Sequence, residues 1–360
     1  MLMLFTILYG KEFTMAKRIL TGIRPTGPLH LGHYVGALKM WKELQDQDEY
    51  ECFFLVADVQ ALTTHADRPS VIEEAVKEVV LDFIAVGLDP TNPNTHFVLQ
   101  SWVPELTELT TYFSMIVPFS RMEGNPTIKA ELSHMGSSPT VGFMIYPTSQ
   151  AADILLFTTY PPQPNDYLLV PVGADQVPHI EEAADIARMF NNRYGNTFLK
   201  CEAKVGLIGR LVGTDGQAKM SKSLGNVIQL SDTPEVVKKA VMKMFTDPKK
   251  IRMGDIGHPK KCPVFIYHEI FGNNLEDQKL RSKDCRLGKL GCANCKKSLV
   301  VTLNTLLDPI RDRREKAEQE PIGDYLISGT NRAREIAQNT MDAVRKAMHL
   351  DYPSIFKKGG

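Results

Sequence analysis

The fold of this chain is decided by the stretch Arg24-Pro25-Thr26-Gly27-Pro28-Leu29-His30-Leu31-Gly32-His33. It follows a short apolar run over residues 18–22, which indicates a buried strand. Apolar residues then recur at helical spacing between Val35 and Leu44, which predicts a helix that begins near Gly32. A strand, a turn rich in Pro and Gly, and a helix in this order favour an anion site, because the free N–H groups and the positive dipole end of the helix face the turn.

Two histidines, His30 and His33, bracket Gly32 at the start of this helix. The pattern is neither G-x-G-x-x-G nor G-x-x-x-x-G-K-[ST], so a dinucleotide site and a P-loop both lose support. The histidines are placed to donate hydrogen bonds to phosphate oxygens in the first helical turn. By itself such a pair also suits packing or capping, so its interpretation depends on a second motif.

The second motif lies far downstream, at Lys219-Met220-Ser221-Lys222-Ser223. Two lysines that flank small residues in a polar loop suit a clamp on a polyphosphate, although alone they also suit a solvated basic loop. Together, the two motifs resemble the ATP-binding motifs of class I aminoacyl-tRNA synthetases. The resemblance extends from about Lys17 to Leu350. It implies catalytic roles for His30, His33, Lys219 and Lys222, and ATP contacts, with Mg²⁺, at Arg24, Thr26, Gly27, Gly32, Gly173, Asp175, Gln176 and Ser221.

Apolar strands alternate with amphipathic helices over the first two thirds of the chain. We expect strands over residues 52–57, 96–101 and 167–172, and helices over 73–86, 104–122, 149–156 and 179–190, with a polar loop over 123–139. This alternation predicts an α/β fold with a Rossmann-like, doubly wound parallel sheet. Beyond residue 232 long charged amphipathic stretches dominate, which predicts a C-terminal α-helical domain.

The net charge is zero, but its distribution is uneven. Residues 1–232 carry 17 Lys and Arg against 26 Asp and Glu, whereas residues 233–360 carry 25 against 16. A basic C-terminal third is typical of a polyanion-binding module, although a solvated helical surface would have the same charge. We therefore expect a catalytic domain over 15–232 and, from the resemblance, an anticodon-binding domain over 233–360.

The N-terminal residues 1–14 lack the basic start and the cleavage site of a signal peptide. Met15 directly precedes the first predicted strand, so we expect 1–14 to be a disordered or mis-assigned extension. No run of 18 apolar residues occurs, so no membrane span is expected. These features favour a cytoplasmic enzyme.

Three polar residues, Tyr146, Gln150 and Asp153, are spaced to lie on roughly one helical face inside an apolar segment. The segment resembles the substrate helix of tryptophanyl-tRNA synthetases, which implies that Asp153 accepts the indole N–H and that Tyr146 borders the ring. Tyrosyl enzymes have a similar segment, so tyrosine stays the alternative substrate. Gln150 stands where many tryptophanyl enzymes have Met, and Ala174 where they more often have Glu.

Six cysteines divide into two lone apolar residues, Cys52 and Cys201, and four that lie together in the C-terminal third. The four are Cys262, Cys285, Cys292 and Cys295. Without a secretory signal two disulfides are disfavoured, and a four-thiolate metal site is the natural interpretation. Spacing alone does not separate Zn²⁺ from an iron–sulfur cluster. The pattern resembles that of tryptophanyl-tRNA synthetases with a [4Fe-4S] cluster, which implies the cluster ahead of structural zinc.

The resemblance implies a complete function. L-Tryptophan and ATP would form tryptophanyl-adenylate, and the aminoacyl group would pass to tRNA(Trp). The family further implies a homodimer. The rival from another class is a non-catalytic, synthetase-like protein that binds or senses RNA.

Overall fold

The computed structural model describes residues 17–133, 138–158, 161–162, 166–206, 208–209, 211–272, 274–352 and 355. The expected extension over 1–14 lies outside the described residues. In this part of the chain no helix combines the length and the hydropathy that a bilayer crossing requires.

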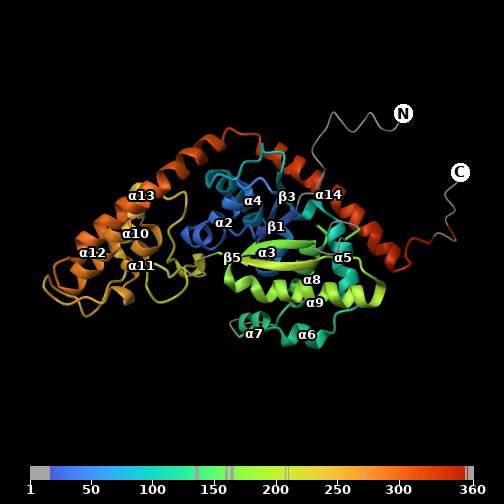
Figure 1. The fold of residues 1–360 in the computed structure, drawn as a ribbon, viewed down its shortest axis with the longest axis horizontal. Helices are drawn as coiled ribbons and strands as arrows, with labels where there is room; N and C mark the ends of the chain where they lie inside the picture. Colours follow the sequence, from blue (N-terminus) through green and yellow to red (C-terminus); the bar gives the residue numbers. More distant parts are fainter. Residues whose placement is uncertain are drawn as a thin grey trace.

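Five parallel strands form one sheet in the order β3-β2-β1-β4-β5 (Figure 1). They are β1 (Lys17–Ile23), β2 (Tyr50–Val56), β3 (Thr95–Leu99), β4 (Tyr167–Val172) and β5 (Lys200–Val205). Every residue of β2 after Tyr50 is buried, as in a strand covered by helices on both faces. The strand order reverses between β1 and β4, where such sheets bind ligands beyond the carboxyl ends of their strands. The predicted Rossmann-like fold is confirmed.

Helices cover both faces of the sheet, so two cores form. Ile19 and Phe54 belong to one core and their neighbours Leu20 and Phe53 to the other, because successive strand residues point to opposite faces. The helical run after β1 consists of α1 (Leu31–His33), a π-helical turn (Tyr34–Leu38) and α2 (Lys39–Gln45). The remaining helices up to β5 are α3 (Asp58–His65), α4 (Pro69–Ala85), α5 (Glu105–Ser114), α6 (Phe119–Gly124), α7 (Pro126–Leu132), α8 (Val141–Leu155) and α9 (Val177–Tyr194).

Several predicted elements differ from the structure. The helix expected over 149–156 is the second half of α8, which begins at Val141. The helix expected over 104–122 is split into α5 and α6, because Pro118 has an extended backbone and no N–H to continue the helix. The loop expected over 123–139 contains α7, which Asn125 caps by accepting the Thr127 N–H at 2.9 Å. The strand expected over 96–101 ends at Leu99, and Gln100 begins a 3₁₀ turn.

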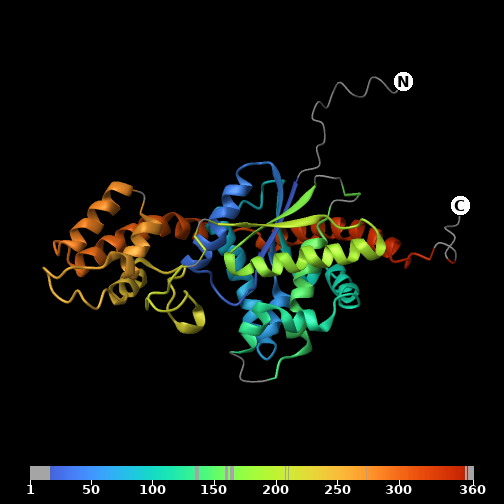
Figure 2. The ribbon, with the colours of Figure 1, turned by 60° about the horizontal axis from the view of Figure 1, so that its bottom comes forward.

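The C-terminal helices are α10 (Pro234–Lys243), α11 (Pro263–Phe271), α12 (Leu275–Arg286), α13 (Cys292–Ala317) and α14 (Ile322–Ala347). Figures 1 and 2 show α10, α11, α12 and the start of α13 as a lobe beside the sheet body. α13 then runs to the body and α14 lies along β3, where the Leu99 N–H donates to Thr330 Oγ1 at 3.0 Å. The domain boundary at residue 232 stays a prediction.

Candidate active site

The two histidines of the turn after β1 are neutral hydrogen-bond donors. His30 Nδ1 accepts the Gly32 N–H at 3.1 Å, and His33 Nδ1 accepts the His30 N–H at 3.2 Å. Since a backbone N–H only donates, each ring carries its proton on Nε2. Burial, with the charges of Lys222 and Lys219, lowers the pKa of His30 to about 4, and burial lowers the pKa of His33 well below its ordinary value. Both rings can therefore offer an Nε2–H to a phosphate oxygen at neutral pH.

The segment that follows the lysine loop pairs with the histidine turn. The Leu31 N–H donates to the Ile228 carbonyl and the Leu230 N–H donates to the Leu29 carbonyl, both at 2.9 Å. A Cβ on Gly32 would lie 2.9 Å from two atoms of the His30 ring, so glycine makes room for that ring, and Met220 of the lysine loop lies at an ordinary contact distance from the same position. Two motifs almost 190 residues apart in sequence thus form one site.

Both lysines of the loop contact turns that follow strands of the sheet, namely the turn after β4 and the turn after β1. Lys222 Nζ donates to the Gly27 carbonyl at 2.9 Å, and Lys219 Nζ pairs with Asp175 Oδ2 at 3.0 Å. Gly27 has a φ of 115°, which favours glycine. Burial lowers the pKa of Lys222 to about 8. The residues that we expected to hold phosphates therefore lie together.

One residue that the sequence did not single out braces this loop. Asn226 is buried, and its Oδ1 accepts the Ser221 N–H at 2.8 Å. Its Nδ2 donates to Asp215 Oδ2 at 2.9 Å and to the Lys219 carbonyl at 3.3 Å. The asparagine thus fixes the backbone on both sides of Met220. Its only signal in the sequence is its place in the same Gly-containing loop.

Asp153 lies on α8 and is buried, with 4% of its surface exposed. Gln100 Nε2 donates to both of its carboxylate oxygens, at 2.8 and 2.9 Å. Gln100 Oε1 accepts the Gln60 N–H at 3.0 Å, which fixes the amide with its donor side towards Asp153. Burial nevertheless raises the pKa of Asp153 to about 7. Neither glutamine was predicted, because Gln60, Gln100 and Asp153 lie on three separate elements.

The other two residues of the predicted triad face α9. Tyr146 Oη lies 3.4 Å from His179 Nε2, and their rings form an edge contact at 5.3 Å. Gln150 Nε2 donates to Gln176 Oε1 at 3.3 Å, so α8 touches the turn after β4. His179 was not predicted; it is buried, and its Nδ1 has no hydrogen-bond partner.

The remaining predicted ATP contacts are placed as follows. Gly173 ends β4 and lets Asp175 fold over it, since a Cβ there would lie 2.9 Å from Asp175 Oδ1. Thr26 lies in the turn beside Gly27. Arg24 donates to Thr63 Oγ1 on α3 at 3.4 Å. Its charge opposes the rise that burial causes in the pKa of Tyr146.

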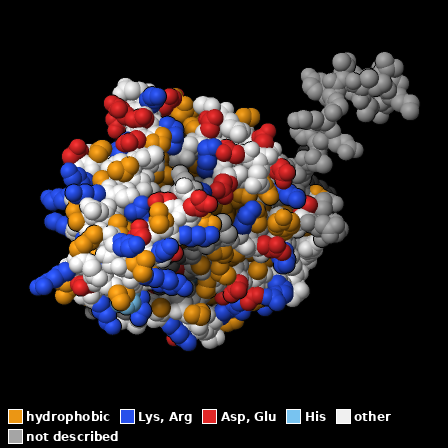
Figure 3. Space-filling model, turned by 60° about the vertical axis from the view of Figure 1, so that its left-hand side comes forward, with side chains coloured by type: hydrophobic (Ala, Val, Ile, Leu, Met, Phe, Trp, Pro, Cys, Tyr) orange, Lys and Arg blue, Asp and Glu red, His pale blue; other side chains and the backbone are white. Residues whose placement is uncertain are grey.

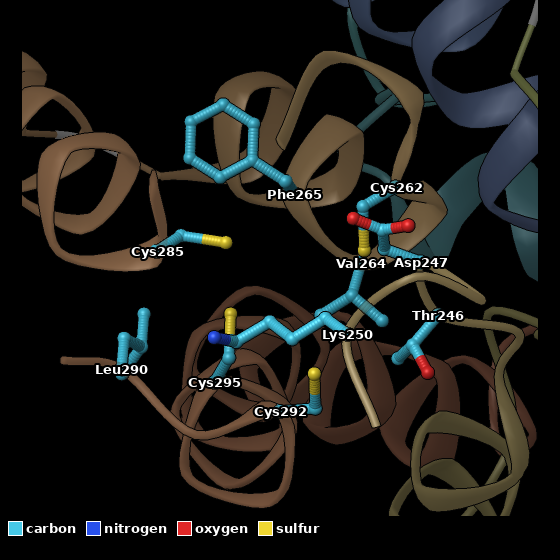
Figure 4. A pocket seen from close by; sticks show the side chains of 10 residues that line it. All are labelled: Thr246, Asp247, Lys250, Cys262, Val264, Phe265, Cys285, Leu290, Cys292 and Cys295. Atoms are coloured by element: carbon cyan, nitrogen blue, oxygen red, sulfur yellow. The ribbon is translucent and has the colours of Figure 1, made fainter. Parts of the chain in front are cut away.

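The four clustered cysteines line one hollow in the C-terminal lobe, with Asp247, Lys250 and Phe265 on its walls (Figure 4). The hollow measures about 380 Å³, including its part open to solvent. Cys262 caps the start of α11, Cys292 and Cys295 lie in the first turn of α13, and Cys285 lies in the last turn of α12. Cys52 and Cys201 are buried free thiols, as predicted.

Two features of the hollow suit a cluster of thiolates. Two helices begin there, so their N-terminal dipoles favour negative charge on three of the sulfurs. Gly257 lets the chain approach Cys285, since a Cβ would lie 2.4 Å from its Sγ. However, within the described ranges no three His, Cys, Asp or Glu side chains are arranged to hold a metal ion. The four sulfurs point into the hollow from different sides (Figure 4).

Comparison with known proteins gives a consistent result. The family described as "tRNA synthetases class I (W and Y)" matches residues 12–308. The tryptophan--tRNA ligase of Thermotoga maritima is 44% identical over 338 residues, which cover 92% of this chain and 99% of that protein. The ligase of Clostridium longisporum is 44% identical over 346 residues, covering 94% and 98%. The tryptophanyl-tRNA synthetase of Campylobacter jejuni, solved with ADP and tryptophan, is 32% identical with a TM-score of 0.77, covering 92% and 99%.

Proposed function

The chain belongs to the class I tRNA synthetases of the tryptophan and tyrosine family, and we propose that it is a tryptophan--tRNA ligase. The observation that carries this function is the contact of Lys222 with Gly27, which joins the two motifs that resemble the ATP-binding motifs of the family. Its relatives act on tryptophan by name, which favours tryptophan over tyrosine and a ligase over a non-catalytic RNA-binding protein.

In the first step the tryptophan carboxylate attacks the α-phosphorus of Mg·ATP. An oxygen–phosphorus bond forms, the bond to the bridging oxygen of the β-phosphate breaks, and pyrophosphate leaves with that electron pair. No side chain acts as nucleophile, because positioning and charge stabilisation accelerate displacement at phosphorus. His30 and His33 would donate Nε2–H bonds to phosphate oxygens. Lys219 and Lys222 would exchange their protein partners for the phosphates as charge moves to pyrophosphate.

In the second step a hydroxyl of the terminal tRNA adenosine attacks the acyl carbon, and AMP leaves. The turn from Gly173 to Gln176 lies beside Gln150 and Lys219. This turn would therefore contact both the adenylate and the amino acid.

Specificity would reside in Asp153. Its carboxylate only accepts hydrogen bonds, and the indole N–H only donates. Gln100 holds it from the protein side. An amino acid that lacks this proton would leave an acceptor lone pair of the buried carboxylate unpaired, despite the bonds from Gln100, and would therefore bind less well.

The test of this function is tryptophan-dependent exchange of pyrophosphate into ATP by the full chain, followed by aminoacylation of tRNA(Trp), with tyrosine as the competing substrate. We expect exchange with tryptophan and none above background with tyrosine. Exchange with tyrosine, or none with either amino acid, would overturn the assignment.

We also propose that the four cysteines hold a [4Fe-4S] cluster. Four thiols line one hollow at two helix N-termini, and four cysteines are the ligand set of a [4Fe-4S] cluster and also of a structural Zn²⁺. The resemblance of the cysteine spacing favours the cluster. When bound, such a cluster would tie together the separate segments that carry its ligands. Cys262, Cys285, Cys292 and Cys295 would each supply one thiolate.

The C-terminal lobe is our candidate for the binding site of the tRNA anticodon. The face of the lobe in Figure 3 shows many Lys and Arg side chains. Exposed basic residues are close in sequence to the four cysteines, namely Arg252, Lys260, Lys261, Lys283, Arg286, Lys289 and Lys297. Phosphate contacts of this kind dominate nucleic-acid affinity. We accordingly retain the division into a catalytic domain over 15–232 and an anticodon-binding domain over 233–360.

A homodimer is proposed for the cytoplasmic enzyme. Large apolar side chains are exposed around α5, α6 and α8, among them Met115 at 74% and Val141 at 76%. A second copy that covers this face would remove that apolar surface from water. Size-exclusion chromatography with light scattering measures the molar mass and so tests the dimer. The mass of a monomer at micromolar concentration would contradict it.

A further inference from the structure

A buried carboxylate lies directly behind the histidine turn. Asp82, on α4, has no exposed surface, and its Oδ2 accepts the N–H of Leu29 at 2.7 Å. Leu29 is also fully buried and immediately precedes His30. The position of the first histidine is therefore fixed from behind by a side chain that is far from it in sequence.

The counter-charge of Asp82 comes from the C-terminal region. Arg314 Nη1 donates to Asp82 Oδ1 at 2.8 Å and to the Glu78 carbonyl at 3.3 Å, and Nη2 pairs with the Glu78 carboxylate. Arg314 is 9% exposed, so water does little to screen the pair. A buried carboxylate without such a partner would be costly.

Arg314 lies near the end of α13, the helix that begins at the cysteine hollow. Cys295 and Arg314 are 19 residues apart on this helix. At 1.5 Å per residue that is about 28 Å. One helix thus joins the cysteine lobe to the backbone of the phosphate turn (Figure 1).

Four groups face Asp82 from the elements around it. They are the Arg314 guanidinium from α13, the Glu78 carboxylate from α4, the Leu29 N–H from the turn and the Lys222 ammonium from the lysine loop. Burial raises the pKa of Asp82 to about 6, against the charge of Arg314 and the Leu29 hydrogen bond. The charge of Asp82 in turn opposes the fall that burial causes in the pKa of Lys222.

We propose that Asp82 and Arg314 are positioning residues for tryptophan activation: their ion pair holds Leu29, and with it His30 and His33, in the place where Lys222 can close on the ATP phosphates. This rests on the proposed function. It means that the phosphate site is completed by a side chain of the C-terminal region, so a catalytic fragment that ends before α13 would bind ATP poorly.

The test uses the full chain with R314M, D82N and the conservative R314K. The matched control is R313M, because Arg313 on the same turn donates to the Ala85 carbonyl at 2.7 Å and has no contact with Asp82. Direct ATP affinity and the KM values for ATP and tryptophan in pyrophosphate exchange are measured for each. We expect R314M and D82N to weaken ATP binding on the order of 10- to 100-fold, since a displacement of about 1 Å costs up to about 10²-fold. The KM for tryptophan and the behaviour of R313M should not change.

The pH profile separates positioning from mere folding. In the wild type, kcat/KM for ATP should fall as the pH drops below about 6, where Asp82 takes up a proton. R314M should move this inflection to higher pH, D82N should remove it, and R314K should restore most of the ATP affinity. Equal losses for both substrates, or wild-type ATP affinity and pH profile in folded R314M, would overturn the proposal.

Folding is checked by thermal melting. If R314M does not fold, the ATP affinities of R314K and D82N test the positioning role instead, because both variants keep a hydrogen-bonding side chain at the site. A wild-type chain that binds ATP but shows no tryptophan-dependent exchange would refute the proposed function. In that case the ATP affinities of R314M and R313M would still test the positioning role, because only R314M is expected to bind ATP more weakly.

Discussion

The ammonium of Lys222 donates to the backbone carbonyl of Gly27 at 2.9 Å, although the two residues are 195 positions apart. The lysine therefore rests on the turn that precedes His30 and His33. We expect a phosphate that binds to this turn to replace the carbonyl as partner of the ammonium. The charge that stabilises the departing pyrophosphate would then be at the site before ATP arrives.

Substitution Lys222→Ala should lower the rate of tryptophan activation by about 10²- to 10³-fold, as the loss of one transition-state donor does in other enzymes. The KM for tryptophan should not change, because the lysine faces the turn and not Asp153. Pyrophosphate exchange at saturating tryptophan measures the effect. The exposed Lys200, which pairs with Glu202 at 2.7 Å, provides the control variant Lys200→Ala. A normal exchange rate in Lys222→Ala would refute its role.

Activity should also fall on the alkaline side. Burial lowers the pKa of Lys222 to about 8, so the free enzyme loses this charge as the pH rises through that value. We expect kcat/KM for ATP to decline across this range, because that parameter reports the free enzyme. Lys222→Arg keeps the charge at all relevant pH values and should lack the decline. The same alkaline limb in Lys222→Arg would assign it to another group.

Tryptophan recognition should depend on the charge of Asp153. Burial raises its pKa to about 7, so the carboxylate is protonated below that pH and can no longer offer two acceptor oxygens. We expect kcat/KM for tryptophan to fall as the pH decreases through about 7. Asp153→Asn should lower kcat/KM for tryptophan at pH 8 and remove this inflection, while the KM for ATP stays the same. An unchanged preference for tryptophan over tyrosine in this variant would exclude Asp153 as the discriminator.

The cysteine hollow should yield iron. Anaerobically purified protein is expected to be brown, with iron and sulfide in equal amounts and broad thiolate-to-iron absorption. Cys262→Ser and Cys292→Ser should lose the iron and melt at lower temperature, because the segments around the hollow lose their common link. Cys52→Ala, at a buried thiol in β2, is the control that should keep its iron. Colourless protein with one bound zinc would replace the cluster by a structural zinc site.

The contact of α14 with β3 should be intolerant of added volume. A Cβ on Gly329 would lie 2.2 Å from the Phe97 carbonyl oxygen. This oxygen belongs to the backbone of β3, which cannot shift easily to relieve the clash. Gly329→Ala should therefore destabilise the protein by about 1–3 kcal/mol, as overpacking does. Gly323→Ala, on the same helix with nothing within 4 Å, should be neutral or stabilising by up to about 1 kcal/mol. Thermal melting compares the two, and equal melting temperatures would show that α14 adjusts freely.

Single residues in the sequence mark two of the element boundaries that we predicted wrongly. Pro118 cannot continue a helix, and Asn125 before Pro126 is a helix start. We gave more weight to the apolar periodicity over 104–122 than to Pro118, and more weight to the polar composition of 123–139 than to Asn125. Helix existence followed from periodicity, but the ends depended on single residues.

The sequence by itself determined the fold class, the two ATP motifs, the polar triad and the four cysteines. Each of these is carried by residue type at a fixed local spacing, which a chain displays before it folds. Only the tertiary structure decided that Gln100 holds Asp153, that Asn226 braces the lysine loop, and that Arg314 supports the histidine turn. These contacts join residues on separate elements, up to 232 positions apart, and a contact between elements leaves no period or spacing in the sequence.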